Sequence, residues 1–198
     1  MISNLYILIY KSLNWANFMS KKLIIDWNEY NRSIDELAVQ ISESGFKPSF
    51  IICIARGGLR VGDILSRIFK IKCGYLGVES YSSAGEGKVS DVQNELTFAR
   101  DLSTTSKIYG ENILVTDDLI DTGVTLEKTL DWLKNYKDFA NKKITFKSAV
   151  LYKKEKSKFK SDYIVHNLKD NPWIVFPYEL RELISIEQLK KELKKRAR

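Results

Sequence analysis

The sequence predicts an α/β fold in which helices flank a central parallel sheet. Short, continuous apolar runs, typical of strands buried on both faces, alternate with segments whose apolar residues recur at helical spacing. The chain has 198 residues, of which 44% are hydrophobic and 29% are charged. This length and composition are enough for one globular domain with its own core.

The first predicted helix begins after Asp26. Asp26 and Glu29 have the spacing of a capping box, and Gly45 is a typical helix end. Between these ends runs an apolar stripe at helical spacing, made of Tyr30, Ile34, Leu37 and Ile41. The isoleucine-rich run SFIICIA that follows predicts a central parallel strand.

This strand ends in the turn ARGGL, which is the first candidate site. Gly57 and its neighbouring glycine let the backbone approach a ligand closely, and Arg56 offers a fork of donors to phosphate oxygens. An ordinary strand-to-helix turn is the alternative. A helix over Leu59–Phe69 and a strand over Gly74–Val78 are predicted next.

A long polar stretch follows, from Ser80 to about Lys107. Loops of that length in compact domains are usually lids or disordered segments. The stretch is therefore expected to be a lid or a disordered segment, with a short hairpin through Asn94–Ala99 as an alternative for its middle.

The second candidate site is the stretch ILVTDDLIDTGVTL. A buried strand over Ile113–Val115 carries Asp117 and Asp118 at its carboxyl end, the edge where open α/β sheets bind ligands. Residues 121–125 then turn into a helix, so backbone N–H groups and two hydroxyls converge in a volume that suits a phosphate. The carboxylates suit sugar hydroxyls or magnesium, so the combination indicates a phosphorylated sugar. A plain helix-capping turn is the alternative.

The rest of the chain predicts a helix over Leu126–Tyr136 and strands over Phe146–Tyr152 and Asp162–His166. The lysine pair after the first of these strands could meet a carbonyl-type oxygen, or it could be solvated. In the later run NPWIVFPYE, Trp173 offers a flat face for stacking, although aromatic residues in such runs are more often part of the core.

Composition excludes several classes of site. Two cysteines cannot make a disulfide framework or a four-ligand zinc site, and we expect a reducing cytoplasm as the setting. His166 is the single histidine, and no G-x-S-x-G elbow is present, so a serine-histidine triad is disfavoured. Much of the net charge of +7 lies in the last twelve residues, where a solvated basic helix over about 185–198 is predicted and nucleic-acid contact is a minority alternative.

The motifs together resemble the type I phosphoribosyltransferases. The acidic stretch matches their signature of a hydrophobic run, paired acids, two apolar residues, Asp-Thr-Gly, one residue and Thr. ARGG resembles their pyrophosphate-binding loop, which often holds a cis peptide. W-I-x-x-P-aromatic-acid resembles the 6-oxopurine branch, the xanthine-guanine and hypoxanthine phosphoribosyltransferases of bacteria and archaea. The resemblance covers Leu23 to Glu179 and implies a small carboxyl-terminal hood and a mobile lid loop.

The implied reaction transfers the 5-phosphoribosyl group of 5-phosphoribosyl 1-diphosphate (PRPP) to N9 of hypoxanthine, guanine or xanthine. The products are a nucleoside 5′-monophosphate and pyrophosphate. The resemblance assigns the 5′-phosphate to Asp121, Thr122, Gly123, Val124 and Thr125. Arg56 and Gly57 would hold the pyrophosphate, and Asp121 would be the general base.

The same resemblance implies Mg²⁺ as the cofactor. Asp117 and Asp118 would hold the ribose hydroxyls and the metal, and Glu179 a second magnesium ion through water. Lys153 would contact the exocyclic oxygen of the purine, with Lys154 as the alternative, while Trp173 and Ile174 would bind the ring.

Residues 1–18 are an extension of doubtful origin, because Met19 opens the usual start of the resembling enzymes. The apolar run of this extension, Leu5–Ile9 followed by Lys11, is too short for a membrane span. We therefore expect one domain over 19–198, with its hood at about 162–180, in a homo-oligomeric protein without membrane or nucleic-acid partners. The alternatives are a PRPP-sensing regulator that binds nucleic acid and a membrane-associated form anchored by residues 1–18.

Overall fold

The computed structural model describes residues 22–80, 96–105, 107–108, 110–182 and 184–196. Its helices are α2 (Trp27–Glu43), α3 (Gly58–Phe69), α4 (Val124–Lys134), α5 (Ile186–Arg196) and the 3₁₀ turn η1 (Glu179–Arg181). Its strands are β1 (Lys22–Ile24), β2 (Phe50–Ala55), β3 (Lys72–Ser80), β4 (Leu96–Phe98), β5 (Asn112–Ile120), β6 (Thr145–Lys153), β7 (Tyr163–Asn167) and β8 (Trp173–Val175). None of the helices within these ranges is long and apolar enough to cross a membrane.

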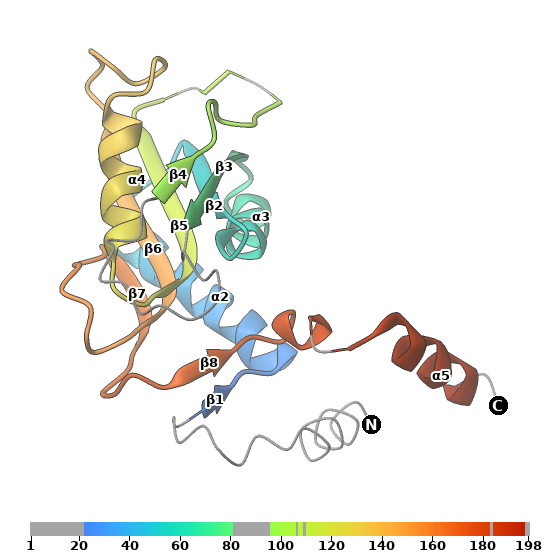
Figure 1. Ribbon diagram of the computed structural model, residues 1–198. Helices are drawn as coiled ribbons and strands as arrows, with labels where there is room; N and C mark the ends of the chain where they lie inside the picture. Colours follow the sequence, from blue (N-terminus) through green and yellow to red (C-terminus); the bar gives the residue numbers. More distant parts are fainter. Residues whose placement is uncertain (1–21, 81–95, 106, 109, 183, 197–198) are drawn as a thin grey trace, which may run out of the picture. The chain divides into compact units, whose positions relative to one another are not determined.

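The chain forms two compact units, and the larger one spans Asp26–Asn171. It holds a six-stranded sheet in the order β4-β3-β2-β5-β6-β7, shown with its helices in Figure 1. Every neighbouring pair is parallel except β3 and β4, which are antiparallel. The predicted α/β fold with a mostly parallel central sheet is therefore confirmed.

Strand β2 separates two packing layers, because successive side chains of a strand point to opposite faces. Phe50, Ile52 and Ile54 pack in one core cluster with Leu126 and Leu133 of α4 and with residues of β5. On the other face Cys53 lies so close to Gly62 of α3 that a side chain there would collide with its sulfur. Helix α4 thus covers one face of the sheet and α3 the other.

Helix α2 begins where the capping signal predicted. The carboxylate of Asp26 accepts hydrogen bonds from the backbone N–H groups of Asn28 and Glu29, at 2.8 and 2.9 Å. The side chain of Glu29, however, accepts a hydrogen bond from the hydroxyl of Tyr152 at 3.3 Å. This contact ties the first turn of the helix to β6.

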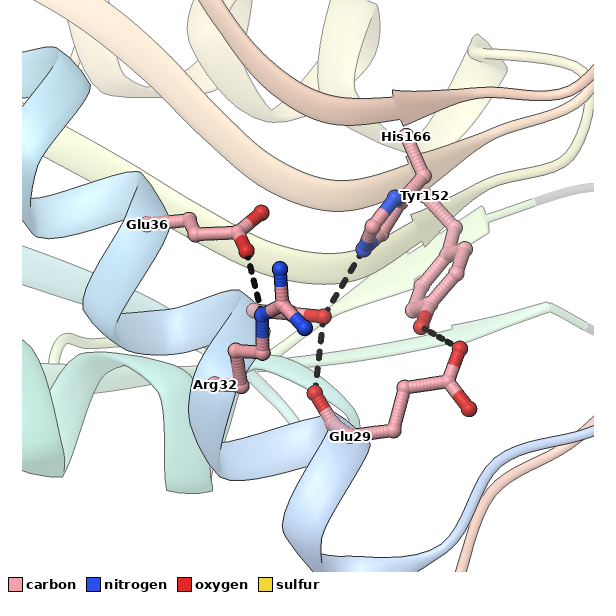
Figure 2. A network of polar contacts seen from close by, with 6 residues as sticks. Glu29, Arg32, Glu36, Tyr152 and His166 are labelled. Carbon is pink, nitrogen blue, oxygen red and sulfur yellow. Dashed lines mark hydrogen bonds and ion pairs between the residues drawn. The ribbon is translucent and has the colours of Figure 1, made fainter.

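A polar network fastens α2 to the sheet (Figure 2). The hydroxyl of buried Ser33 donates to the backbone oxygen of Glu29 at 2.9 Å and lies 2.8 Å from Nε2 of His166. The His166 ring stacks on Tyr152, with ring centroids 4.6 Å apart. These contacts give the single histidine a structural place between α2, β6 and β7.

Strand β5 is longer than the predicted Ile113–Val115. It pairs with β6 as far as Ile120, so Asp117 and Asp118 lie inside the paired strand and the turn begins only at Asp121. The prediction ended the strand too early because it took the acids as a strand end. Asp117 still pairs with Val150 of β6, and Leu119 beyond the acids pairs with Tyr152. This backbone pairing does not depend on side-chain polarity.

The expected lid over Ser80–Lys107 is only partly described, since residues 81–95 lie outside the described ranges. Its later part is packed on the sheet: β4 pairs with β3, and Ser103 bridges to Tyr75. Leu102 is buried, and its N–H donates to the hydroxyl of Tyr136 at 3.3 Å. Residues 96–105 are therefore anchored to the sheet, and the lid stays a prediction.

The smaller unit joins the segment up to Ile25 with the segment from Pro172 onwards. In it β1 and β8 form a two-stranded parallel sheet that pairs Leu23 with Ile174, and the N–H of Ile25 continues the pairing to the oxygen of Val175. The hood was expected over about 162–180, but β7 belongs to the large sheet and β8 to the small one. Residues 1–18 lie outside the described ranges.

Candidate active site

Two loops from neighbouring strands meet at the carboxyl edge of the large sheet. A Cβ atom on Gly57, after β2, would lie 2.5 Å from Oδ1 of Asp118 on β5. A Cβ atom on the next residue, Gly58, would collide with the backbone oxygen of Thr116. Glycine at both positions lets the loop after β2 lie directly on the acidic end of β5. The bond between Ala55 and Arg56 is cis, as the resemblance implied for this loop.

Asp117 and Asp118 are half-buried neighbours that constrain each other. The backbone N–H of Asp118 donates to Oδ1 of Asp117 at 2.9 Å. Burial and the negative charge of Asp118 raise the pKa of Asp117 well above its usual range. Two carboxylates that disfavour each other's charge form a site that a cation would stabilise.

Two groups near this acidic pair were not predicted from the sequence. Tyr30, which was expected only in the core, has its pKa raised by burial and by the charge of Asp118. The positive charge of Arg60, in the first turns of α3, opposes this rise in the pKa of Tyr30. The guanidinium of Arg60 lies 5.1 Å from the ring centre of Trp27. A second arginine four residues after Arg56 is the signal that could have identified Arg60.

The turn between β5 and α4 has the form of an anion site. Gly123 adopts a φ of 95°, in the left-handed region that favours glycine. A side chain there would collide with Phe159, and Ser157 donates from Oγ to the backbone oxygen of Thr122 at 2.9 Å. The segment after β6 therefore packs against this turn. Val124 opens α4, and its backbone N–H donates to Oγ1 of Thr122 at 3.4 Å. The N–H groups of a helix's first turn are the ones that an anion can bind.

Asp121 is held by two lysines. The ammonium groups of Lys154 and Lys156 lie 2.9 and 2.8 Å from its Oδ1. Burial opposes the ionisation of Asp121, but the contacts with Lys156 and Lys154 outweigh it and lower the pKa of the carboxyl group. Asp121 is thus a carboxylate in the ligand-free chain.

The lysine that lies at Asp121 is the alternative from the sequence analysis. Lys153 ends β6, where it pairs with Ile120 and Asn167. Lys154 follows it, is buried, and points its ammonium group to Asp121. The sequence did not distinguish the two because they are adjacent in a lysine-rich run.

The three remaining candidates belong to the smaller unit. Trp173 is 62% exposed, whereas Ile174 is buried in the β1-β8 pair. Oε2 of Glu179 accepts a hydrogen bond from the backbone N–H of Phe176 at 2.9 Å. Within the described ranges, three or more His, Cys, Asp or Glu side chains nowhere gather as a group that could hold a metal ion. A metal at the acidic pair would need ligands from a substrate.

A family model described as the phosphoribosyl transferase domain matches residues 24–183. The chain belongs to the phosphoribosyl transferase domain family. This confirms the family resemblance, which was drawn from the ARGG and TDDLIDTGVT motifs.

Individual phosphoribosyltransferases are similar over most of their length. The chain is 28% identical to the xanthine-guanine phosphoribosyltransferase of Idiomarina loihiensis, over 81% of this chain and 89% of that protein. It is 27% identical to the enzyme of the same name from Gluconobacter oxydans, over 80% and 85%.

Solved structures show the same fold. The purine phosphoribosyltransferase of Pyrococcus horikoshii is 29% identical, with a TM-score of 0.58 over 80% of this chain and 93% of that one. The xanthine-guanine-hypoxanthine phosphoribosyltransferase of Helicobacter pylori has a TM-score of 0.66 at 23% identity, over 86% and 99%. At that identity the second match speaks for the fold alone.

Proposed function

We propose that this protein is a purine salvage phosphoribosyltransferase, which transfers the 5-phosphoribosyl group of PRPP to N9 of a 6-oxopurine. The observation that carries the proposal is the contact at the sheet edge between the loop after β2 and the acidic end of β5, where Gly57 lies against Asp118. The loop after β2 suits a pyrophosphate, and the end of β5 with the turn after it suits a ribose 5-phosphate. The similarity to xanthine-guanine phosphoribosyltransferases over about four fifths of the chain supports a 6-oxopurine as the acceptor.

PRPP would span both loops. The turn over residues 121–125 would hold the 5′-phosphate by the N–H groups at the start of α4 and by the hydroxyls of Thr122 and Thr125. The carboxylates of Asp117 and Asp118 would accept hydrogen bonds from the ribose hydroxyls. Arg56 is exposed at the end of β2, where its guanidinium suits the pyrophosphate.

The acidic pair fits a magnesium ion. Mg²⁺ is usually held by one or two carboxylates together with substrate phosphates and water, which is the donor set that Asp117, Asp118 and PRPP would provide. When bound, the ion would neutralise charge on the departing pyrophosphate. Glu179 is a candidate only for a second ion through water, because its Oε2 already binds the N–H of Phe176.

Asp121 and a neighbouring lysine would contact the purine. Asp121 is a carboxylate beside the phosphate turn, where it can take the proton of the incoming base. Lys154 is our first choice for the 6-oxo oxygen, and Lys153 remains the alternative. Trp173 would stack on the ring, while the backbone at Ile174 would meet its edge. Because the transition state resembles an oxocarbenium ion, positioning and electrostatics would supply much of the acceleration.

The regulator alternative receives no support from the site. A protein that only senses PRPP has no need for a general base, yet Asp121 is present and is held by two lysines. The basic helix α5, which suggested nucleic acid, belongs to the smaller unit.

The test is magnesium-dependent release of pyrophosphate from PRPP with hypoxanthine, guanine, xanthine, adenine, uracil and orotate, each offered separately. We expect release with at least one 6-oxopurine and little with the pyrimidines. Tight binding of PRPP without release for any base would refute the transferase and favour the regulator.

A further inference from the structure

One oxygen of Asp121 carries two ammonium groups that differ in their surroundings. Lys154 and Lys156 both contact Oδ1, at 2.9 and 2.8 Å. The side chain of Lys154 is 10% exposed, whereas that of Lys156 is 45% exposed. Two ammonium ions on one oxygen repel each other, so the arrangement holds only while the carboxylate is charged.

Under the proposed function, Lys154 also binds the purine. If it donates a hydrogen bond to the 6-oxo oxygen, part of its interaction with Asp121 is lost when Asp121 takes the proton of the purine. The Asp121 side chain is 48% exposed and follows directly on a strand end, so water could then reorient it. Lys156 is the charged partner that remains.

We propose that Lys156 is a positioning residue, which holds the carboxylate of Asp121 in place while Lys154 turns to the 6-oxo oxygen of the purine. The inference rests on the proposed function. In the transfer, the C1′–N9 bond forms, the bond from C1′ to the pyrophosphate oxygen breaks, and the proton on purine N7 passes to Asp121. Because both lysines bind Oδ1, Oδ2 takes that proton.

The two lysines also lower the pH at which Asp121 ionises. Within the described ranges, the charged groups in contact with its carboxylate are Lys154 and Lys156, both from the segment after β6. The acids of the preceding strand β5 are Asp117 and Asp118. Losing Lys156 removes one of the two cations that oppose the effect of burial. The pKa of Asp121 then rises, and the base stays protonated up to a higher pH.

The experiment compares three variants in steady-state turnover of hypoxanthine with PRPP across the acid range. K156Q removes the charge, K156R keeps it, and K158Q removes the charge of another exposed lysine two residues further along the same segment. For K156Q we expect kcat to fall about tenfold, a modest share of what general-base catalysis supplies, with the KM for hypoxanthine nearly unchanged. The acid limb of its pH profile should move to higher pH. K156R should restore both properties, and K158Q should match the wild type.

A purely structural role would not move the acid limb. The proposal is overturned if K156Q keeps the wild-type kcat and pH profile, or if K158Q changes as K156Q does. A wild-type protein that transfers no 6-oxopurine would refute the proposed function and, with it, this inference. An active wild type with an unaltered K156Q refutes the role of Lys156 alone. Carbon-13 NMR titration of the Asp121 carboxyl group in the ligand-free protein is a second measurement that needs no turnover. We expect the pKa of Asp121 to be higher in K156Q than in the wild type and unchanged in K158Q.

Discussion

Gly57 and Asp118 lie so close that a Cβ atom on the glycine would be 2.5 Å from one carboxylate oxygen and 2.6 Å from the other. Gly57 follows β2 and Asp118 lies in β5, and these two strands are adjacent and parallel. The loop proposed for pyrophosphate therefore packs against the acid proposed for ribose and magnesium. A substitution of either residue should weaken the binding of both the pyrophosphate and the ribose of PRPP.

Gly57→Ala tests this contact. The added methyl group must displace Asp118, and a displacement of about 1 Å in a catalytic group can cost about 100-fold in rate. We expect kcat/KM for PRPP to fall by about that factor, measured as pyrophosphate release. Gly77→Ala is the matched control, because a Cβ atom there would make an ordinary contact of 3.5 Å with Ala99. Equal activity of the two variants would contradict the proposed role of the loop.

Gly123→Ala tests the phosphate turn. Alanine at a φ of 95° is strained by about 1–3 kcal/mol, and its methyl group would push Phe159 away. We expect a lower unfolding temperature and a raised KM for PRPP. Ser157→Ala removes only the hydrogen bond to the oxygen of Thr122, so its KM should change in the same direction by less. A change in the purine KM alone would place the phosphate elsewhere.

The choice between the two lysines is tested by Lys154→Met and Lys153→Met. Loss of a hydrogen bond from a charged group costs about 1.5–3 kcal/mol, which is roughly 10- to 150-fold in affinity. We expect Lys154→Met to raise the KM for hypoxanthine within that range and Lys153→Met to change it little. The reverse result would return the role to Lys153.

The network of Figure 2 should matter for stability and not for turnover. His166→Ala removes the contact with buried Ser33 and the stack on Tyr152, together worth about 1–3 kcal/mol in the free energy of unfolding. Arg32→Ala in the same region breaks only an exposed pair with Glu36, so its effect should stay below about 0.5 kcal/mol. Chemical denaturation checks both, and kcat should equal the wild-type value in each. A large loss of kcat in His166→Ala would give the histidine a catalytic role.

Local signals in the sequence were enough to predict most of the large sheet and the two loops. The Asp26 cap, the apolar run of β2 and the long acidic motif each carry their information within a few residues. The pairing of β1 with β8 could not be predicted, because three-residue strands from opposite ends of the chain leave no local pattern. Likewise, Leu102 is one apolar residue in a polar stretch, and only the sheet shows where it is anchored.

The lysines show the same limit at the site. Which of two adjacent lysines meets Asp121 depends on a strand register of one residue, which the run KKEKSKFK does not reveal. The contact of Lys156 with Asp121 could not be predicted either, because a lysine in such a charged run is usually solvated.

The most direct test of the account is to look for the product of Asp121→Asn beside that of the wild type. Each protein is incubated with PRPP, magnesium and hypoxanthine, guanine or xanthine, and the nucleoside 5′-monophosphate is quantified by chromatography. We expect product from the wild type with at least one of these bases. In Asp121→Asn we expect PRPP binding near the wild-type level but nucleotide formation slower by about 100-fold or more, the scale of general-base catalysis. A wild type that makes no nucleotide, or an asparagine variant that makes it at the wild-type rate, would contradict the account.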